Sequence, residues 1–345
     1  MSNTLLRSVC GTLLTSGALM LNGIAAAEST LIPAAGPVFG VVTAPDGSIL
    51  ATDAGSGVHE YRKGTFSPIA QLPGATDVAA IGRGNMFVIT SGGFGGDGRL
   101  YRVANGSVRE IADLAEFEAT VNPDGAEINP NPFDVAVLNG GQALVTDAGG
   151  NSLLIVDQRG TIDWVATLPP EVVSTANVKS LLGCPGSGAE ACDLPESIPA
   201  QAVATSIAIG PDGAYYVSEL KGFPAPTDES RVWRIEPGAR HARCGSSSAC
   251  SVALDGFTSI IDLTFGPDGT LYVVELDENS WFALEPPAGP PIGGSVNACN
   301  VATGSCTQLA TGLFMATAAT VSKDGTVSVV TNGLIPGAAT LSTLP

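Results

Sequence analysis

Short runs of apolar residues separated by turn residues recur along the chain, and residues 261–275 show the pattern clearly. They hold an apolar run, a four-residue turn Gly-Pro-Asp-Gly and a second run of β-branched and aromatic residues. This order predicts a β-hairpin, because proline and aspartate suit the centre of such a turn and glycine its exit. The unit occurs six times, with its turn glycine at Gly47, Gly84, Gly141, Gly213, Gly269 and Gly325. Such repetition is the strongest structural signal in the sequence.

Acidic residues recur at the two hairpin positions that lie farthest from the turn. Seven residues before the turn glycine, the six copies hold Gly40, Asp77, Asp134, Ser206, Asp262 and Ala318. Six residues after it, they hold Asp53, Thr90, Asp147, Glu219, Glu275 and Thr331. In a regular hairpin these two positions lie opposite each other. We therefore expect the carboxylates to gather at one level of the fold.

Further strand-like segments follow the hairpins, so each repeat is predicted to be a four-stranded antiparallel sheet. The last repeat is one strand short, whereas residues 29–35 form a strand candidate without a hairpin partner. A ring of six sheets can close when this N-terminal strand joins the last sheet, which leaves no free edge. A sandwich or a β-solenoid would not explain hairpins that repeat about every 56 residues with insertions between them. The sequence predicts an all-β fold, a six-bladed β-propeller of four-stranded antiparallel blades.

The first 27 residues have the features of a secretory signal peptide. Arg7 supplies the basic start, residues 9–21 the apolar core and residues 25–27 a small-residue cleavage site. The alternative is an uncleaved membrane anchor, but the apolar run is short and interrupted by glycine and threonine. We expect one propeller domain over residues 28–345 that is secreted or periplasmic and has no membrane contact after signal removal.

Seven cysteines are present, and Cys10 would leave with the signal peptide. The other six fall into close pairs: Cys184 and Cys192, Cys244 and Cys250, and Cys299 and Cys306. Fifteen pairings are formally open, and sequential local pairs fit the spacing best. Since an exported protein meets oxidising conditions, we expect three disulfides. Zinc is disfavoured, because the cysteine spacings are wrong and only two histidines could complete a site.

The chain has a formal net charge of −18. Such an acidic protein repels nucleic acid and anionic membrane surfaces, so both are excluded as partners. It attracts cations, although acidity also serves simply to keep an exported protein soluble. We expect a monomer.

Several segments resemble a known family. Residues 133–137 with 147–154, residues 201–206 with 210–213, the Glu219–Pro224 segment and the hairpin at 261–275 are similar to the ScyD/ScyE family, relatives of NHL-repeat propellers. The likeness covers roughly residues 36–335. It implies an exported propeller and brings no settled biochemical activity. The family is named for a gene cluster for the exported pigment scytonemin, and this chain departs from it in its cysteine pairs and long insertions.

The acidic positions are the candidate binding site, at the channel mouth on the loop side of the ring. They are Asp53, Asp77, Asp134, Asp147, Glu219, Asp262 and Glu275. Like-charged neighbours need a cation, raised pKa values or hydrogen-bond donors. Oxygen ligands without histidine point to Ca²⁺ or Mg²⁺, for which Asp134, Asp262 and Glu275 are the candidate ligands. The alternative is that these acids accept backbone hydrogen bonds and brace adjacent blades.

Three function classes fit a propeller of this kind. The first is an exported module that binds a small molecule or a protein, and it suits the lack of a nucleophile–base signature. The alternative is a metal-dependent hydrolase or lactonase of the gluconolactonase type, which combines a carboxylate with asparagine ligands; no asparagine occupies the matching positions. A histidine-dependent lyase is disfavoured, because His59 and His241 lie on outer segments. The sequence favours the binding module.

Overall fold

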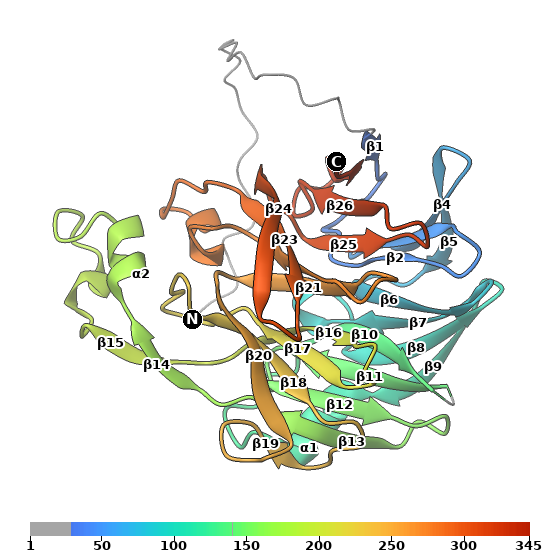
Figure 1. Cartoon of the computed structure of the whole chain (residues 1–345), viewed down its shortest axis with the longest axis horizontal. Coiled ribbons are helices and arrows are strands. Elements are labelled where there is room, and N and C mark those ends of the chain that lie inside the picture. The colour runs from blue at the N-terminus through green and yellow to red at the C-terminus, as the bar shows by residue number, and fades with distance from the viewer. Residues whose placement is uncertain (1–28, 140) are drawn as a thin grey trace, which may run out of the picture.

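The computed structural model describes residues 29–139 and 141–345, and the predicted signal peptide lies outside these described residues. Six four-stranded antiparallel sheets follow one another around a ring, which confirms the six-bladed β-propeller (Figure 1). Each blade starts at the axis with the hairpin that the repeat predicts and continues outward. Strands form here because the hairpin runs are rich in β-branched and apolar residues between glycine-containing turns.

The first three blades are regular. Blade 1 consists of β2 (Val41–Thr43), β3 (Ile49–Asp53), β4 (Gly57–Arg62) and β5 (Thr65–Gln71). Blade 2 consists of β6 (Ala75–Gly82), β7 (Asn85–Thr90), β8 (Arg99–Ala104) and β9 (Ser107–Asp113). Blade 3 consists of β10 (Pro132–Leu138), β11 (Gln142–Asp147), β12 (Ser152–Val156) and β13 (Ile162–Thr167), and β19 (Ala242–Arg243) adds to its outer edge in parallel.

The last three blades complete the ring. Blade 4 consists of β16 (Ala204–Ile209), β17 (Tyr215–Glu219), β18 (Ser230–Ile235) and β20 (Cys250–Phe257). Blade 5 consists of β21 (Ile260–Phe265), β22 (Leu271–Glu275), β23 (Gly294–Asn300) and β24 (Ser305–Leu313). Blade 6 consists of β25 (Ala318–Val321), β26 (Val327–Thr331), β27 (Thr340–Thr343) and the N-terminal β1 (Ser29–Leu31). The pairing of β1 with β27 confirms the predicted closure of the ring.

Insertions between blades and loops within them carry the remaining elements. Helix α1 (Leu114–Val121) precedes blade 3, and the hairpin of β14 (Glu171–Ser174) and β15 (Ser197–Ala200) precedes blade 4. That hairpin and α2 (Ala176–Leu181) extend away from the ring (Figure 1). The short 3-10 turns are η1 (Gly92–Phe94), η2 (Glu190–Asp193) and η3 (Trp281–Leu284). No helix among the described residues is long and apolar enough to cross a membrane.

The three predicted disulfides are confirmed. They join Cys184 to Cys192, Cys244 to Cys250, and Cys299 to Cys306. Each closes a short loop, so each restrains only a small part of the unfolded chain. Apolar side chains fill the spaces between neighbouring blades. Leu144 and Leu153 of blade 3, for example, pack with Ile207 and Val217 of blade 4.

The inner hairpins differ from the regular register at the ends away from the turn. Asp134 faces Thr146, whereas Asp147 faces Pro132. In the same way Asp262 faces Val274, and Glu275 faces Ile260. The prediction that the two acidic positions lie opposite each other is therefore wrong. The register set at the turn pairs the first acidic position with the residue just before the second, and a β-bulge beyond it then moves the second acid opposite Pro132 or Ile260.

Hydroxyl side chains satisfy backbone groups at this level of the inner hairpin in three blades. Thr146 Oγ1 accepts the N–H of Asp134 at 3.1 Å. Thr52 Oγ1 accepts the N–H of Gly40 at 2.9 Å in blade 1, and Ser218 Oγ accepts the N–H of Ser206 at 3.0 Å in blade 4. These N–H groups are buried and would otherwise lack a partner, so the hydroxyls stabilise this end of the three hairpins.

Candidate functional site

The inner strands enclose a cavity of about 290 Å³ along the ring axis. Three carboxylates, Asp77, Asp134 and Asp262, form one end of it and are called here the acidic ring. The other lining residues are mostly apolar and run along the inner strands toward the hairpin turns, as far as Ala80, Val137, Ile209 and Phe265. The cavity therefore lies between the acidic ring and the turn side of the propeller, where it meets solvent.

Aromatic side chains close the axis on the opposite, loop side. Phe39 precedes the first strand of blade 1 and Phe133 lies in the first strand of blade 3, and both are buried. Their ring centroids are 5.2 Å apart, and Phe94 packs on Phe39 at 4.7 Å. Since blades 1 and 3 are not neighbours, this contact reaches across the axis. The sequence places the inner-strand acids at a loop-side mouth, whereas the structure places them beneath this aromatic plug and facing the turn side.

Each carboxylate of the acidic ring holds the next blade. Asp77 Oδ2 accepts the N–H of Val135 at 3.1 Å. Asp134 Oδ2 accepts the N–H of Ile207 at 2.8 Å, and Asp262 Oδ2 accepts the N–H of Ala319 at 2.7 Å. The acids thus bridge blades 2 to 3, 3 to 4 and 5 to 6. These contacts match the alternative prediction, in which the acids brace adjacent blades.

Ser206 fills the same position in blade 4 and links two of the acids. Its Oγ accepts the N–H of Leu263 at 3.0 Å, donates to Asp134 Oδ2 and lies 3.2 Å from Asp262 Oδ1. Ser206 was not among the predicted site residues, so this role was missed. The signal was present, because Ser206 stands in the same repeat position as the three aspartates.

Gly40 occupies the ring position in blade 1, where a side chain has no room. A Cβ there would collide with the Asp77 carboxylate and would lie 2.8 Å from the Asp77 Cα. The first blade therefore lacks a ring side chain because the carboxylate of its neighbour takes that space.

The acidic ring has strongly perturbed ionisation. Burial, followed by the charge of Asp134, raises the pKa of Asp262 to about 7. Burial and the same neighbour raise the pKa of Asp77 well above its usual value. At neutral pH the cavity end therefore holds fewer than three negative charges, and a bound cation would favour the ionised forms.

The other four predicted site residues do not line the cavity. They end the second strand of their blades, and their carboxylates contact loops on the plug side. Asp53 accepts the N–H groups of Ala35 and Gly36 at 2.8 and 2.7 Å, and Asp147 accepts that of Asn131 at 2.9 Å. Glu219 accepts the Trp233 indole N–H at 2.6 Å.

Glu275 accepts the N–H of Thr258 at 2.5 Å and the side-chain donors of Ser295 and Asn297. The structure thus brings Asp134 and Asp262 together through Ser206 but leaves Glu275 elsewhere. Within residues 29–139 and 141–345, no three His, Cys, Asp or Glu side chains form a group suited to a metal ion. Several oxygens of the acidic ring also already accept backbone N–H groups. The ring fits a hydrated ion or an organic cation better than a dehydrated metal ion.

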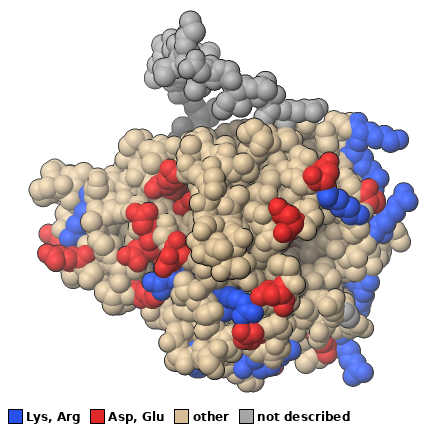
Figure 2. All heavy atoms as spheres, viewed as in Figure 1, with Lys and Arg blue, Asp and Glu red and all other residues tan. Residues whose placement is uncertain are grey.

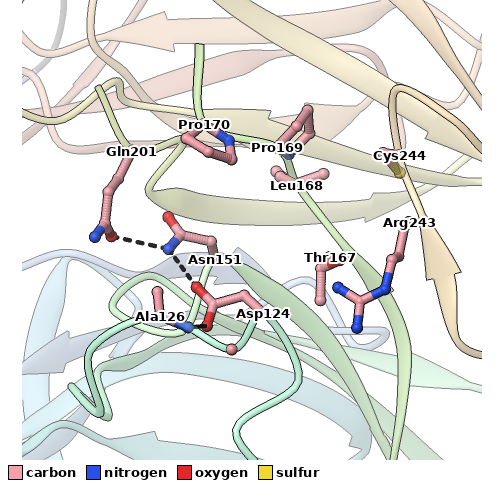
Figure 3. A pocket seen from close by; sticks show the side chains of 11 residues that line it. Asp124, Ala126, Asn151, Thr167, Leu168, Pro169, Pro170, Gln201, Arg243 and Cys244 are labelled. Atoms are coloured by element: carbon pink, nitrogen blue, oxygen red, sulfur yellow. Dashed lines mark hydrogen bonds between the residues drawn. The ribbon is translucent and has the colours of Figure 1, made fainter. Parts of the chain in front are cut away.

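A second pocket, of about 300 Å³, lies on the loop side over blade 3 and was not predicted (Figure 3). Asn151 lies at its base and donates to Asp124 Oδ2 at 2.8 Å and to Gln201 Oε1 at 2.9 Å. Arg243 lines the opposite wall and its guanidinium stands 5.6 Å from the Trp164 ring centroid. The polar groups at its base already satisfy one another, so this pocket offers fewer free groups than the axial cavity.

No protein family model and no curated protein sequence matches this chain. Several solved structures do match this chain. A gluconolactonase from Xanthomonas campestris superposes with a TM-score of 0.58 at 14% identity, over 92% of this chain and 90% of the other. A putative glucose dehydrogenase from Thermus thermophilus gives 0.55 at 15%, over 92% and 100%. A putative gluconolactonase gives 0.52 at 12%, over 93% of each chain. At these identities the likeness shows the six-bladed propeller fold alone.

Proposed function

We propose that this chain is an exported binding module that takes a small, positively charged molecule into its axial cavity. The observation that carries the proposal is the acidic ring, which ends an otherwise mostly apolar cavity of about 290 Å³. A protonated amine with a short apolar tail matches this combination, because the ammonium would meet carboxylates and the tail would meet the strand walls. The cavity volume favours a small molecule over a protein as the ligand.

Two further parts of the proposal concern the family and a metal ion. Membership of the ScyD/ScyE family is supported by the propeller fold together with the quoted segments, and export is supported by the three disulfides. A hydrated Ca²⁺ or Mg²⁺ ion is the second cation proposed for the acidic ring, and titration with each metal salt measures its binding directly.

The test is calorimetric titration of the purified protein with butylammonium, choline, CaCl₂ and MgCl₂. We expect a saturable signal with at least one organic cation, and its loss when Asp134 and Asp262 are both changed to Asn. Asp268→Asn is the matched control, because Asp268 is an exposed acid in the turn of the same hairpin as Asp262. Absence of binding for all four probes, or unchanged binding by the double variant, would contradict the proposal.

A hydrolase of the gluconolactonase type is the second candidate, favoured by the pKa of Asp262 near 7. A carboxyl group with such a pKa beside a cavity can act as a general base at neutral pH. Turnover of small lactones by the wild type, abolished by Asp262→Asn and kept by Asp268→Asn, would favour the hydrolase. Binding without turnover would favour the module.

A further inference from the structure

Four blades hold a buried carboxylate at the end of their second strand, and in three of them both carboxylate oxygens face a donor or a cation. In blade 1, Ser56 donates to Asp53 Oδ2 at 2.5 Å and His59 Nε2 lies 3.5 Å from it. In blade 5, Ser295 and Asn297 donate to Glu275 Oε2 at 2.8 and 2.7 Å.

Blade 4 pairs its buried carboxylate with a lysine. Lys221 is fully buried, and its Nζ lies 2.8 Å from Glu219 Oε2. The same Nζ donates to Glu171, which comes from the inserted hairpin of β14 and β15. One positive charge thus lies between two carboxylates, one from the blade and one from the insertion that precedes it.

Blade 3 has the two carboxylates without the lysine. Asp147 Oδ1 accepts three backbone N–H groups, those of Asn131, Gly149 and Gly150. Asp147 Oδ2 is buried and has no hydrogen-bond partner among the described residues. The second carboxylate is Glu118 of the inserted helix α1, which is 1% exposed and whose Oε1 is equally without a partner among them.

The two carboxylates meet at one glycine. Gly150 donates its N–H to Asp147 Oδ1 at 2.9 Å, and a Cβ on Gly150 would lie 2.7 Å from Glu118 Oε2. Helix α1 is held in this place by its N-cap, where Asp113 accepts the N–H of Glu116 at 2.9 Å. The Glu118 carboxylate is therefore seated on the loop that already binds Asp147.

A third unpartnered oxygen belongs to the same neighbourhood. Ser152 is the direct cross-strand partner of Asp147, and its buried Oγ has no hydrogen-bond partner within the described part of the chain. Asp124, the next acid along the chain, is engaged by Asn151 (Figure 3) and is not counted as a ligand. Three buried oxygens from a helix, a strand end and the facing strand thus lack partners at one place.

We infer that blade 3 binds one Ca²⁺ ion between Glu118 and Asp147, with Ser152 as a further oxygen ligand, where blade 4 uses the ammonium of Lys221. The ligands are all oxygens, as calcium prefers, and two carboxylates match its charge.

The test uses the full chain after treatment with a chelator. Equilibrium dialysis against about 1 mM CaCl₂, a concentration at which extracellular modules bind calcium, is followed by metal analysis and by thermal unfolding. We expect one Ca²⁺ per chain at this site, in addition to any ion at the acidic ring, and a melting temperature several degrees above that of the calcium-free protein, because the ion binds the folded state. The double variant of Asp134 and Asp262 should keep this response, which separates it from the axial cavity.

The informative variant is Glu118→Gln, which keeps the side-chain shape and removes one charge. It should lose the bound calcium and the calcium-dependent shift, and should melt above the wild type when calcium is absent, since it removes like-charge repulsion. Glu116→Gln is the matched control, because Glu116 is an exposed acid on the same helix. Ser152→Ala should weaken calcium binding. It should change the melting temperature of the calcium-free protein less than Glu118→Gln does.

Three results would overturn the inference. The first is no calcium bound by the wild type under these conditions. The second is an unchanged calcium response of Glu118→Gln. The third is a response to MgCl₂ with none to CaCl₂, which would reject calcium as the ion.

Discussion

At the scale of single residues, the acidic ring makes the stability of the protein depend on pH. The folded-state pKa of Asp262, about 7, is above the 3.8 of an unperturbed aspartate. A group with a raised folded-state pKa stabilises the fold fully below its unfolded pKa, and this contribution is lost as pH rises through the folded pKa. Asp77 shifts in the same direction. The acidic ring therefore loses its stabilising contribution as the pH rises from about 4 to about 7.

Asp262→Asn should make the stability less dependent on pH in that window. The asparagine stays neutral, so the variant should avoid a loss of up to about 4 kcal/mol in the free energy of unfolding between pH 4 and pH 7. Urea unfolding at several pH values measures this, with Asp268→Asn as the control. A pH profile identical to that of the wild type would contradict the assignment of a raised pKa to Asp262.

Repeat positions reveal residue types but not partners. The sequence places Asp77, Asp134, Ser206 and Asp262 at the same position of their repeats, and the structure brings them together. The shared repeat position does not reveal that Ser206 joins two aspartates, because that depends on how closely neighbouring blades approach. Glu118 lies outside the repeat altogether, so periodicity contains no signal that brings it to Asp147.

At the scale of elements, hydroxyl residues fix the bulges of the inner hairpins. Thr146→Val keeps the side-chain shape but leaves the buried N–H of Asp134 without its acceptor. We expect the free energy of unfolding to fall by about 1–3 kcal/mol. Chemical denaturation checks this, and Thr65→Val on the exposed outer strand β5 should change stability little. Equal losses for the two variants would argue against the hydrogen bond as the cause.

The hairpins could be predicted because turn chemistry and apolar patterning are local. The bulges could not, since apolar Ile89 and Val274 stand in blades 2 and 5 where blade 3 has Thr146. The predicted register put the two acidic positions face to face, whereas the turns pair Asp134 with Thr146 and Asp262 with Val274, one residue earlier. Because adjacent strand residues point to opposite faces, this difference leaves the first acid at the cavity and the second at the loops.

At the scale of the whole molecule, ring closure depends on the short strand β1. Ile32 follows it directly, is fully buried and donates its N–H to Ala339 at 2.8 Å. Ile32→Ala should lower the free energy of unfolding by about 2–5 kcal/mol, because it removes core atoms at the closure. Leu31→Ala is the matched control, since Leu31 is 56% exposed. Denaturant titration of both variants measures the difference, and equal small effects would show that closure contributes little.

Charge is distributed unevenly over the molecule. Lysine and arginine side chains gather at the edge formed by blades 1 and 2, near β4, β5, β8 and β9, while acids are scattered over the rest of the face in view (Figure 2). The net charge of −18 is therefore not a single surface patch. Much of what matters for the two proposed sites is buried acid, which composition alone does not distinguish from surface acid.

The aromatic plug of Phe39, Phe94 and Phe133 determines how a ligand can reach the axial cavity. It closes the axial cavity on the loop side, so a ligand must enter and leave through the opening on the turn side. Anchoring the protein to a support by its loop side should leave exchange rates untouched. A partner protein bound over the turns would instead block both release and entry of the ligand.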